Sequence, residues 1–186
     1  LSSYTPNIEI YSIDEAFLEF KGFENYDLKD YGKEIRKKIL KWTGIPVSIG
    51  FAPTKALAKV ANRISKKFDS KTRGVYVLDS KEKREKALKW LKIEDVWGIG
   101  YKHSERLKNH NIKKAYDFTM LPDDWVRKQM SVLGLRLKKE LEGESVLSLE
   151  EKRSPKKAIA TTRSFEKNIT DFEDLKERVS TFSICC

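Results

Sequence analysis

Residues 8–20, which read IEIYSIDEAFLEF, decide the architecture of this chain. Apolar and β-branched residues alternate with other residues on either side of Asp14 and Glu15, a pattern typical of two half-buried strands. The segment therefore predicts a hairpin with two adjacent carboxylates at or near its tip. Because neighbouring strand residues point to opposite faces, both carboxylates can meet one ion only where the backbone turns or bulges.

The carboxylate pair has two interpretations. Paired carboxylates at an exposed strand end supply the hard oxygen ligands that suit Mg²⁺. Substrate phosphates then complete the coordination shell of the ion. The alternative is an acidic turn that faces solvent, because acidic residues are common in turns.

Composition indicates a globular, basic protein. The 186 residues are 39% hydrophobic and include nine Phe and four Trp, which is enough to fill a core. The net charge is +10, and residues 1–93 carry 20 basic against 12 acidic residues. Between Lys55 and Arg73, seven basic residues accompany one acid, Asp69. This excess indicates a polyanionic ligand such as nucleic acid or a triphosphate, with a solvated helix face as the alternative.

Other classes of protein are disfavoured. No run of 18 apolar residues occurs, and residues 1–11 lack a basic and then apolar leader, so we expect no membrane partner and a cytoplasmic location. Cys185 and Cys186 are adjacent, and His103 and His110 are the two histidines. Neither pattern predicts a disulfide framework or a zinc site.

Strand and helix patterns interleave as far as about residue 93, which predicts an α+β fold with one sheet backed by helices. Strands are expected within 45–51 and 74–78, and a charged helix over 80–91. A further amphipathic helix ends at Gly44 and buries residues at helical spacing, namely Leu28, Tyr31, Ile35, Ile39 and Trp42.

The segment 52–64 predicts a turn that leads into a helix. Lys55 falls in the first helical turn, where free N–H groups and the helix dipole favour an anion. We therefore expect Lys55 to contact a phosphate. Lys59 and Lys66 lie further along the same face, and we expect them to meet only solvent or distant DNA.

Beyond residue 93 the pattern is helical. The sequence VWGIG at 96–100, between two helices, is typical of a helix-hairpin-helix, in which glycines let backbone N–H groups approach a DNA phosphate. A plain packed turn is the alternative. One or two helices follow over 123–143, with Gly143 as the C-cap. We then expect a linker over 144–155, a strand over 157–166 and a helix over 171–182.

Residues 11–18, YSIDEAFL, resemble the palm motif of the Y-family, translesion DNA polymerases. VWGIG at 96–100 and RSF at 163–165 resemble the UmuC-type branch of that family, the catalytic subunits of SOS-induced mutagenic polymerases. The resemblance implies that Asp14 and Glu15 are catalytic ligands of Mg²⁺ and that Lys55 binds the nucleotide. DNA would be bound by the remaining candidates, Gly98, Ile99, Gly100, Lys102 and Arg163.

The resemblance also implies a domain organisation and a function. Residues 1–93 would be the later part of a ferredoxin-like palm, 94–152 a helical thumb, and 153–186 the start of an α+β little-finger domain. The reaction would be Mg²⁺-dependent nucleotidyl transfer to a primer 3′ end opposite damaged template, in SOS mutagenesis and DNA repair. Implied partners are primer-template DNA, a deoxynucleoside triphosphate, a UmuD-type accessory subunit, RecA and the sliding clamp. The chain would be a fragment without fingers, and we expect it not to polymerise alone.

Two other functions compete with a polymerase. A non-catalytic, sequence-independent DNA-binding module explains the basic charge, but it leaves Asp14 and Glu15 beside a polyanion, which is unfavourable without a metal. A two-metal nuclease is the weaker possibility. Mg²⁺-dependent primer extension by the full-length protein separates all three.

Overall fold

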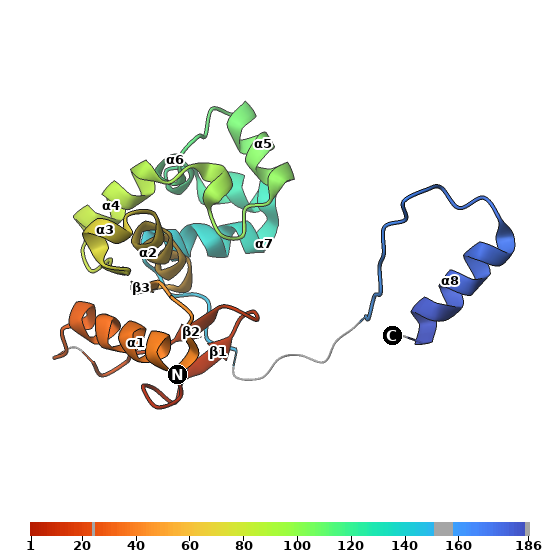
Figure 1. Cartoon of the computed structure of the whole chain (residues 1–186). Helices are drawn as coiled ribbons and strands as arrows, with labels where there is room; N and C mark the ends of the chain where they lie inside the picture. Colours follow the sequence, from red (N-terminus) through yellow and green to blue (C-terminus); the bar gives the residue numbers. More distant parts are fainter. Residues whose placement is uncertain (24, 151–157, 185–186) are drawn as a thin grey trace. The chain divides into compact units, whose positions relative to one another are not determined.

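The computed structural model describes residues 1–23, 25–150 and 158–184. The chain divides into two compact units, Leu1–Leu149 and Glu150–Cys186, called the first and second unit below. The first unit contains both strands and helices, so this coarse feature of the predicted α+β fold is confirmed. Its elements are β1 (Ile8–Ile10), β2 (Ala16–Leu18), α1 (Leu28–Thr43), β3 (Ile49–Phe51), α2 (Lys55–Lys67), α3 (Asp69–Thr72), β4 (Val75–Val77), α4 (Lys81–Trp90), the short 3-10 helix η1 (Ile93–Asp95), α5 (Tyr101–Asn109), α6 (Ala115–Thr119) and α7 (Asp123–Glu142) (Figure 1).

The strands form two separate pairs. β1 and β2 are antiparallel, with Ile8 opposite Leu18 and Ile10 opposite Ala16. β3 and β4 are parallel and are joined through α2 and α3. Among the described residues the two pairs share no strand, so the prediction of a single sheet is wrong for these strands. Alternation along a sequence indicates an extended segment, but it does not indicate which other segment that strand pairs with.

The helix α1 confirms the predicted end at Gly44. The Asp27 carboxylate accepts hydrogen bonds from the N–H groups of Lys29 and Asp30, which caps the N-terminus. Gly44 ends the helix with φ of 71°, a left-handed conformation that glycine adopts without strain. Trp42, however, is 69% exposed, so its predicted place in the core is wrong. Helical spacing includes it on the apolar face, but this face extends beyond the elements that cover it.

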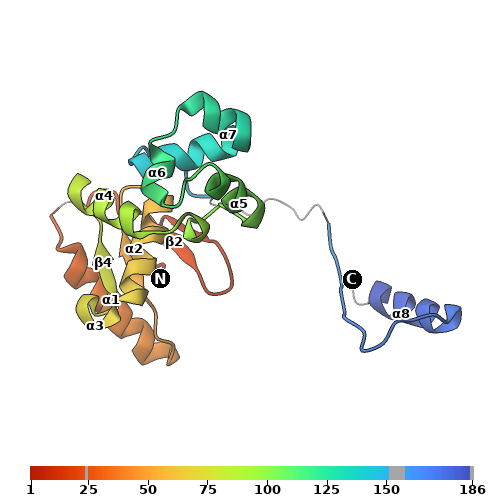
Figure 2. The same cartoon turned by 90° about the horizontal axis from the view of Figure 1, so that it is seen from above.

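The helix α2 is the centre of the first unit. It lies between α1 and the strands on one side and α4, α6 and α7 on the other (Figures 1 and 2). Its apolar face is fully or nearly fully buried, as Leu57, Ala61 and Ile64 show. A Cβ at Gly50 would collide with the backbone of Asn62, so only glycine lets β3 lie this close to α2. This close packing fixes the direction of the opposite, lysine-bearing face of α2.

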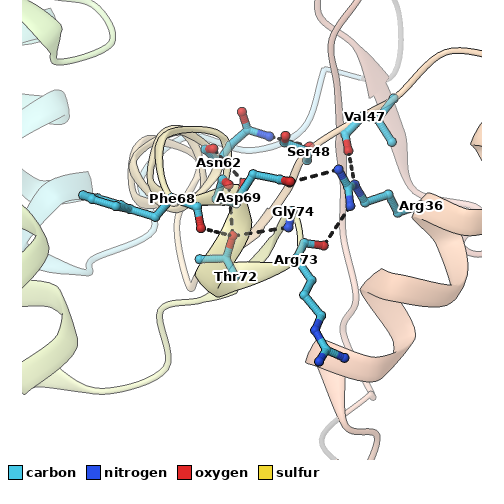
Figure 3. A network of polar contacts seen from close by, with 10 residues as sticks. Arg36, Val47, Ser48, Asn62, Phe68, Asp69, Thr72, Arg73 and Gly74 are labelled. Atoms are coloured by element: carbon cyan, nitrogen blue, oxygen red, sulfur yellow. Dashed lines mark hydrogen bonds and ion pairs between the residues drawn. The ribbon is translucent and has the colours of Figure 1, made fainter.

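Arg36 joins α1 to the ends of the parallel strand pair (Figure 3). Its guanidinium donates to the carbonyl oxygen of Val47 at 2.7 Å and to that of Arg73 at 3.0 Å. A third bond reaches the Asp69 carboxylate at 3.0 Å. The planar guanidinium thus bonds to three acceptors at once, two on loops and one on α3, in a fork geometry that the Lys ammonium lacks. The network holds α1 against the β3–β4 pair.

The helical part of the first unit shares its core with α2. The buried cluster continues from α2 into the later elements through Ile93, Val96, Ile99, Leu107, Phe118, Val126 and Leu141. The predicted helix over 123–143 is confirmed as α7, which is bent at Ser131, where φ is 63° and ψ is −170°. Gly143 caps its end with φ of 96°. In the described parts of the chain, none of the helices is both long enough and apolar enough to cross a membrane.

The second unit contains α8 (Phe172–Ile184), which confirms the predicted helix. Asp171 caps it by accepting from the N–H groups of Glu173 and Asp174. The predicted strand over 157–166 is wrong, because residues 158–166 form no strand, and residue 157 lies outside the described residues. The ring of Phe165 instead stacks on Phe182 of α8, with centroids 6.1 Å apart.

The predicted linker over 144–155 is wrong in its first part. Residues 144–149 belong to the first unit and pack against it. The N–H groups of Val146 and Leu147 donate to the carboxylate of Glu140. Residues 151–155 lie outside the described residues. Polar composition suggested a free segment, whereas a buried acceptor on α7 holds these six residues, called the strap below.

Candidate metal and nucleotide site

The bend at the tip of the β1–β2 hairpin presents Asp14 and Glu15 to solvent. The N–H groups of Tyr11 and Ser12 both donate to the carbonyl oxygen of Glu15 at 3.0 Å. The Ser12 hydroxyl donates to the Asp14 carboxylate at 2.6 Å. These bonds close the hairpin around residues 12–14 and leave both acidic side chains exposed. The predicted carboxylate pair at the hairpin tip is therefore confirmed in its geometry.

The surroundings of Asp14 keep it ionised. The hydrogen bond from Ser12 is the main cause that lowers the pKa of the Asp14 carboxyl group. The positive charges of Lys59 and Lys66 lower this pKa further. Asp14 is thus negatively charged at neutral pH, the state in which a carboxylate binds a metal ion.

A row of lysines on α2 lies along the hairpin. The Lys59 ammonium contacts both carboxylate oxygens of Glu15, at 2.6 and 2.7 Å. It also lies over the ring of Tyr11, 5.4 Å from the centroid. The prediction that Lys59 meets only solvent or distant DNA is wrong, and the charge of Lys66 reaches Asp14 as well. Helical spacing placed these lysines on one face, but only the packing of α2 turned that face toward the hairpin.

Lys55 is more enclosed than Lys59. Its ammonium contacts the carboxylate of Glu9 on β1 at 2.6 Å, and the two side chains are 12% and 8% exposed. The ammonium lies over the ring of Phe17, 4.9 Å from the centroid, and donates to the carbonyl oxygen of Ser148 at 3.4 Å. Lys55 therefore links β1, β2 and the strap.

Two N–H groups in the first turn of α2 have acceptors within the protein. Ala56 donates to the Glu140 carboxylate at 3.1 Å, and Leu57 donates to the Thr54 hydroxyl at 3.2 Å. A carboxylate 84 residues away in the chain thus lies at the N-terminus of α2, where N–H groups favour a negative charge.

Glu140 is a residue that the sequence analysis missed. It is fully buried, with 0% exposure, although its side chain is acidic. One carboxylate oxygen accepts from Ala56, and the other accepts from Val146 at 2.9 Å and Leu147 at 3.0 Å. Its carbonyl oxygen accepts from the Thr54 hydroxyl at 2.8 Å. The only signal in the sequence is its place beside apolar Leu141 in the inner face of α7.

Trp97 connects the hairpin to the glycine turn that follows it, and it was also missed. Its indole N–H donates to the hydroxyl of Tyr11 at 2.9 Å. Its ring lies against Tyr11 and Phe17, with centroids 5.7 and 5.8 Å away. The residue next to the predicted DNA-binding turn therefore contacts the strand that leads to the carboxylates.

The predicted DNA-binding turn is a tight one. Gly98 has φ of 87°, which favours glycine, and Gly100 is the N-cap residue of α5, with no side-chain cap. A Cβ at Gly100 would meet no atom within 4 Å, so the backbone there is accessible. Ile99 is buried, and its N–H donates to the carbonyl oxygen of Val96 at 3.0 Å. Lys102 is exposed in the first turn of α5. Arg163, the last predicted contact, is exposed within the second unit.

Asp14 and Glu15 suit a magnesium ion. Carboxylate oxygens are the ligands that Mg²⁺ prefers, and the ion usually takes one or two of them while keeping water and substrate phosphates. Both side chains are exposed, so such ligands have access. Within 1–23, 25–150 and 158–184, no group of three or more potential metal-binding side chains is assembled. Two exposed carboxylates fit an open site, in which water and phosphates would complete the shell of the ion.

Solved structures define the class of this fold. A crystal structure of a DinB family error prone DNA polymerase from Sulfolobus solfataricus aligns with a TM-score of 0.63 and 28% identity, and it covers 80% of this chain and 44% of that one. An insertion ternary complex of Dbh DNA polymerase aligns with a TM-score of 0.62 and 29% identity, over 80% of this chain and 43% of that one. The mixed α/β fold is thus that of Y-family polymerase domains.

Sequence comparison identifies the family. Residues 1–63 match the impB/mucB/samB family. Protein UmuC of Salmonella typhimurium is 40% identical over 184 residues, which are 98% of this chain and 44% of that protein. The chain belongs to the impB/mucB/samB family of Y-family proteins. It spans less than half the length of these relatives.

Proposed function

We propose that this chain is part of an error-prone translesion DNA polymerase that acts in SOS mutagenesis and DNA repair. The observation that carries the proposal is the exposed Asp14–Glu15 pair beside the lysine row of α2. Acidic metal ligands next to cationic side chains suit a metal-bound triphosphate. The relatives support it by name, since the structures above are titled as DNA polymerases.

Asp14 and Glu15 would hold Mg²⁺. When bound, the metal ions lower the pKa of the primer 3′ hydroxyl and neutralise the triphosphate and its leaving group. The hydrogen bond from Ser12 holds the Asp14 carboxylate at the hairpin tip, where it would be available to the ion. Lys55 remains the proposed nucleotide ligand, and it would have to exchange the Glu9 carboxylate for a phosphate. Lys59, which already contacts Glu15, is the second candidate.

DNA would be held by the helical part of the chain. The backbone at Gly98 and Gly100 would approach phosphates, with Ile99 anchoring the turn in the core and Lys102 adding charge. Such contacts do not depend on base sequence. In this proposal residues 1–93 form the later part of the palm, 94–152 the thumb with its helix-hairpin-helix, and 153–186 the start of the little finger, where Arg163 meets DNA.

The partners would be those that the family resemblance implies. Primer-template DNA and a deoxynucleoside triphosphate are the substrates, and a UmuD-type subunit, RecA and the sliding clamp are the proposed protein partners. We propose that the chain does not polymerise alone, because it supplies two acidic ligands and spans 44% of a full-length relative. In isolation it would act as a sequence-independent DNA-binding module.

The test is Mg²⁺-dependent primer extension by the full-length protein. Asp14→Ala and Glu15→Ala should each reduce extension at least about a hundredfold while the fold is kept, because a lost metal ligand acts on the transition state. Asp30→Ala is the matched control, since Asp30 is an exposed carboxylate that pairs with Lys33 on α1. Near wild-type extension by both site variants would refute the catalytic assignment and favour the non-catalytic module.

A further inference from the structure

Two lysines one helical turn apart on α2 bind two carboxylates of the hairpin in different ways. Lys55 and Glu9 form an enclosed pair, with side chains 12% and 8% exposed. Lys59 and Glu15 form an open pair, with side chains 23% and 42% exposed. Because solvent reaches the second pair, its partners can separate at much lower cost than those of the first.

The open pair occupies the oxygens that a metal ion would use. The Lys59 ammonium contacts both oxygens of Glu15, at 2.6 and 2.7 Å. A magnesium ion bonds to carboxylate oxygens at about 2.0–2.1 Å. The ammonium and a divalent ion therefore cannot both lie against these two oxygens, since their charges would repel at short range.

We propose that Lys59 is a displaceable counter-ion, an inference that rests on the proposed metal site. It occupies the cation position at Glu15 and must leave before a divalent metal ion binds there. The ammonium balances an exposed carboxylate close to Asp14, which limits the repulsion between the two acidic groups while no metal is bound.

Displacement also has a consequence for the lysine itself. Once the metal ion holds Glu15, the Lys59 ammonium stays tethered to α2 and is free to meet another anion beside the metal. By reciprocity, any anion that draws Lys59 away from Glu15 raises the affinity of Glu15 for the metal, and the metal raises the affinity for that anion. The enclosed Lys55–Glu9 pair offers no such exchange at comparable cost.

The experiment measures Mn²⁺ binding to this chain by electron paramagnetic resonance, in which the signal of free aqueous Mn²⁺ decreases on binding. Lys59→Gln should raise the affinity about three- to tenfold, the range expected from loss of a partly exposed competing ion pair. Lys59→Arg, which keeps the charge and can bond both oxygens, should bind no more tightly than the wild type. Lys66→Gln is the matched control, because Lys66 affects Asp14 through its charge alone, and we expect a change below about twofold.

Two further variants separate failure of this proposal from failure of the metal site. Asp14→Asn and Glu15→Gln should each weaken Mn²⁺ binding at least about tenfold. If Asp14→Asn and Glu15→Gln weaken Mn²⁺ binding, and Lys59→Gln changes the affinity no more than Lys66→Gln does, then the Lys59–Glu15 contact is an ordinary surface ion pair. The counter-ion role is then overturned. If Asp14→Asn and Glu15→Gln bind like the wild type, or if no variant binds Mn²⁺, the metal site itself is overturned, and the role of Lys59 with it. Thermal melts of each variant show that the differences do not come from unfolding.

Discussion

Replacement of Glu140 should reveal how much of the first unit depends on one buried carboxylate. The carboxylate accepts three backbone N–H groups, one from Ala56 at the start of α2 and two from Val146 and Leu147 in the strap. Glu140→Ala removes all three acceptors and leaves a small cavity beside Leu141. Glu140→Gln keeps the shape but has one oxygen where the carboxylate has two.

The expected magnitudes follow from these bonds. A buried donor left without an acceptor costs about 1–3 kcal/mol. In Glu140→Gln, the amide oxygen can face the two strap donors, so only the Ala56 N–H loses its acceptor, and we expect a loss of about 1–2 kcal/mol. In Glu140→Ala all three donors are orphaned, but the strap can move and bond to water, so we expect about 3–5 kcal/mol.

Urea unfolding followed by tryptophan fluorescence measures these losses, because all four tryptophans lie in the first unit. Hydrogen exchange adds a local reading, in which the amides of Val146 and Leu147 should exchange faster in Glu140→Ala. Glu144→Ala is the control, since Glu144 is 62% exposed, and it should change stability by less than about 0.5 kcal/mol. An alanine variant as stable as the wild type, or a glutamine variant as damaging as alanine, would refute the capping role of Glu140.

Two further outcomes are expected. Trp97→Phe keeps an aromatic ring but removes the donor to the Tyr11 hydroxyl, so it should lower the free energy of unfolding by about 0.5–1.5 kcal/mol. Adding Tyr11→Phe should lower it little further. Fully additive losses in a double-mutant cycle would show that the 2.9 Å bond contributes nothing. The hydrogen bond from Lys138 is the main cause that lowers the pKa of Asp123 in the folded protein. The folded state therefore binds fewer protons at this site than the unfolded state, and its contribution to stability is present at neutral pH and is lost as the pH falls below about 4. Acid unfolding of Asp123→Asn should show a smaller loss of stability in that range than the wild type, and identical acid profiles would contradict this assignment.

Several elements could be predicted from the sequence because their signals are local. The helix that ends at Gly44 combines an apolar period of 3.6 with a glycine that takes a left-handed conformation, and both act within a few residues. The signals for the hairpin of residues 8–20 and for the helix that begins after Thr54 are local in the same way. The prediction of a strand over 157–166 was wrong for residues 158–166. A strand also requires a second strand to pair with, and alternation along the sequence cannot supply one.

The candidate site was predictable only in part. The motif of residues 11–18 was enough to name Asp14 and Glu15, since both acids lie in one short bend. The direction of the lysine row depended on how α2 packs on β3, where Gly50 permits close approach. Lys59 was therefore expected to meet only solvent or distant DNA, although its ammonium lies 2.6 Å from Glu15.

The sequence by itself determined the family, the positions of most helices and the place of the acidic pair, because these depend on residues close together in the chain. Only the tertiary structure decided which cation meets which carboxylate and which acid fills the N-terminus of α2. Glu140 and Ala56 are 84 residues apart, and Trp97 and Tyr11 are 86 apart. Both contacts form because packing in three dimensions brings distant parts of the chain together, which local sequence does not specify. At Glu140 burial acts as well, because it leaves the carboxylate with few possible partners.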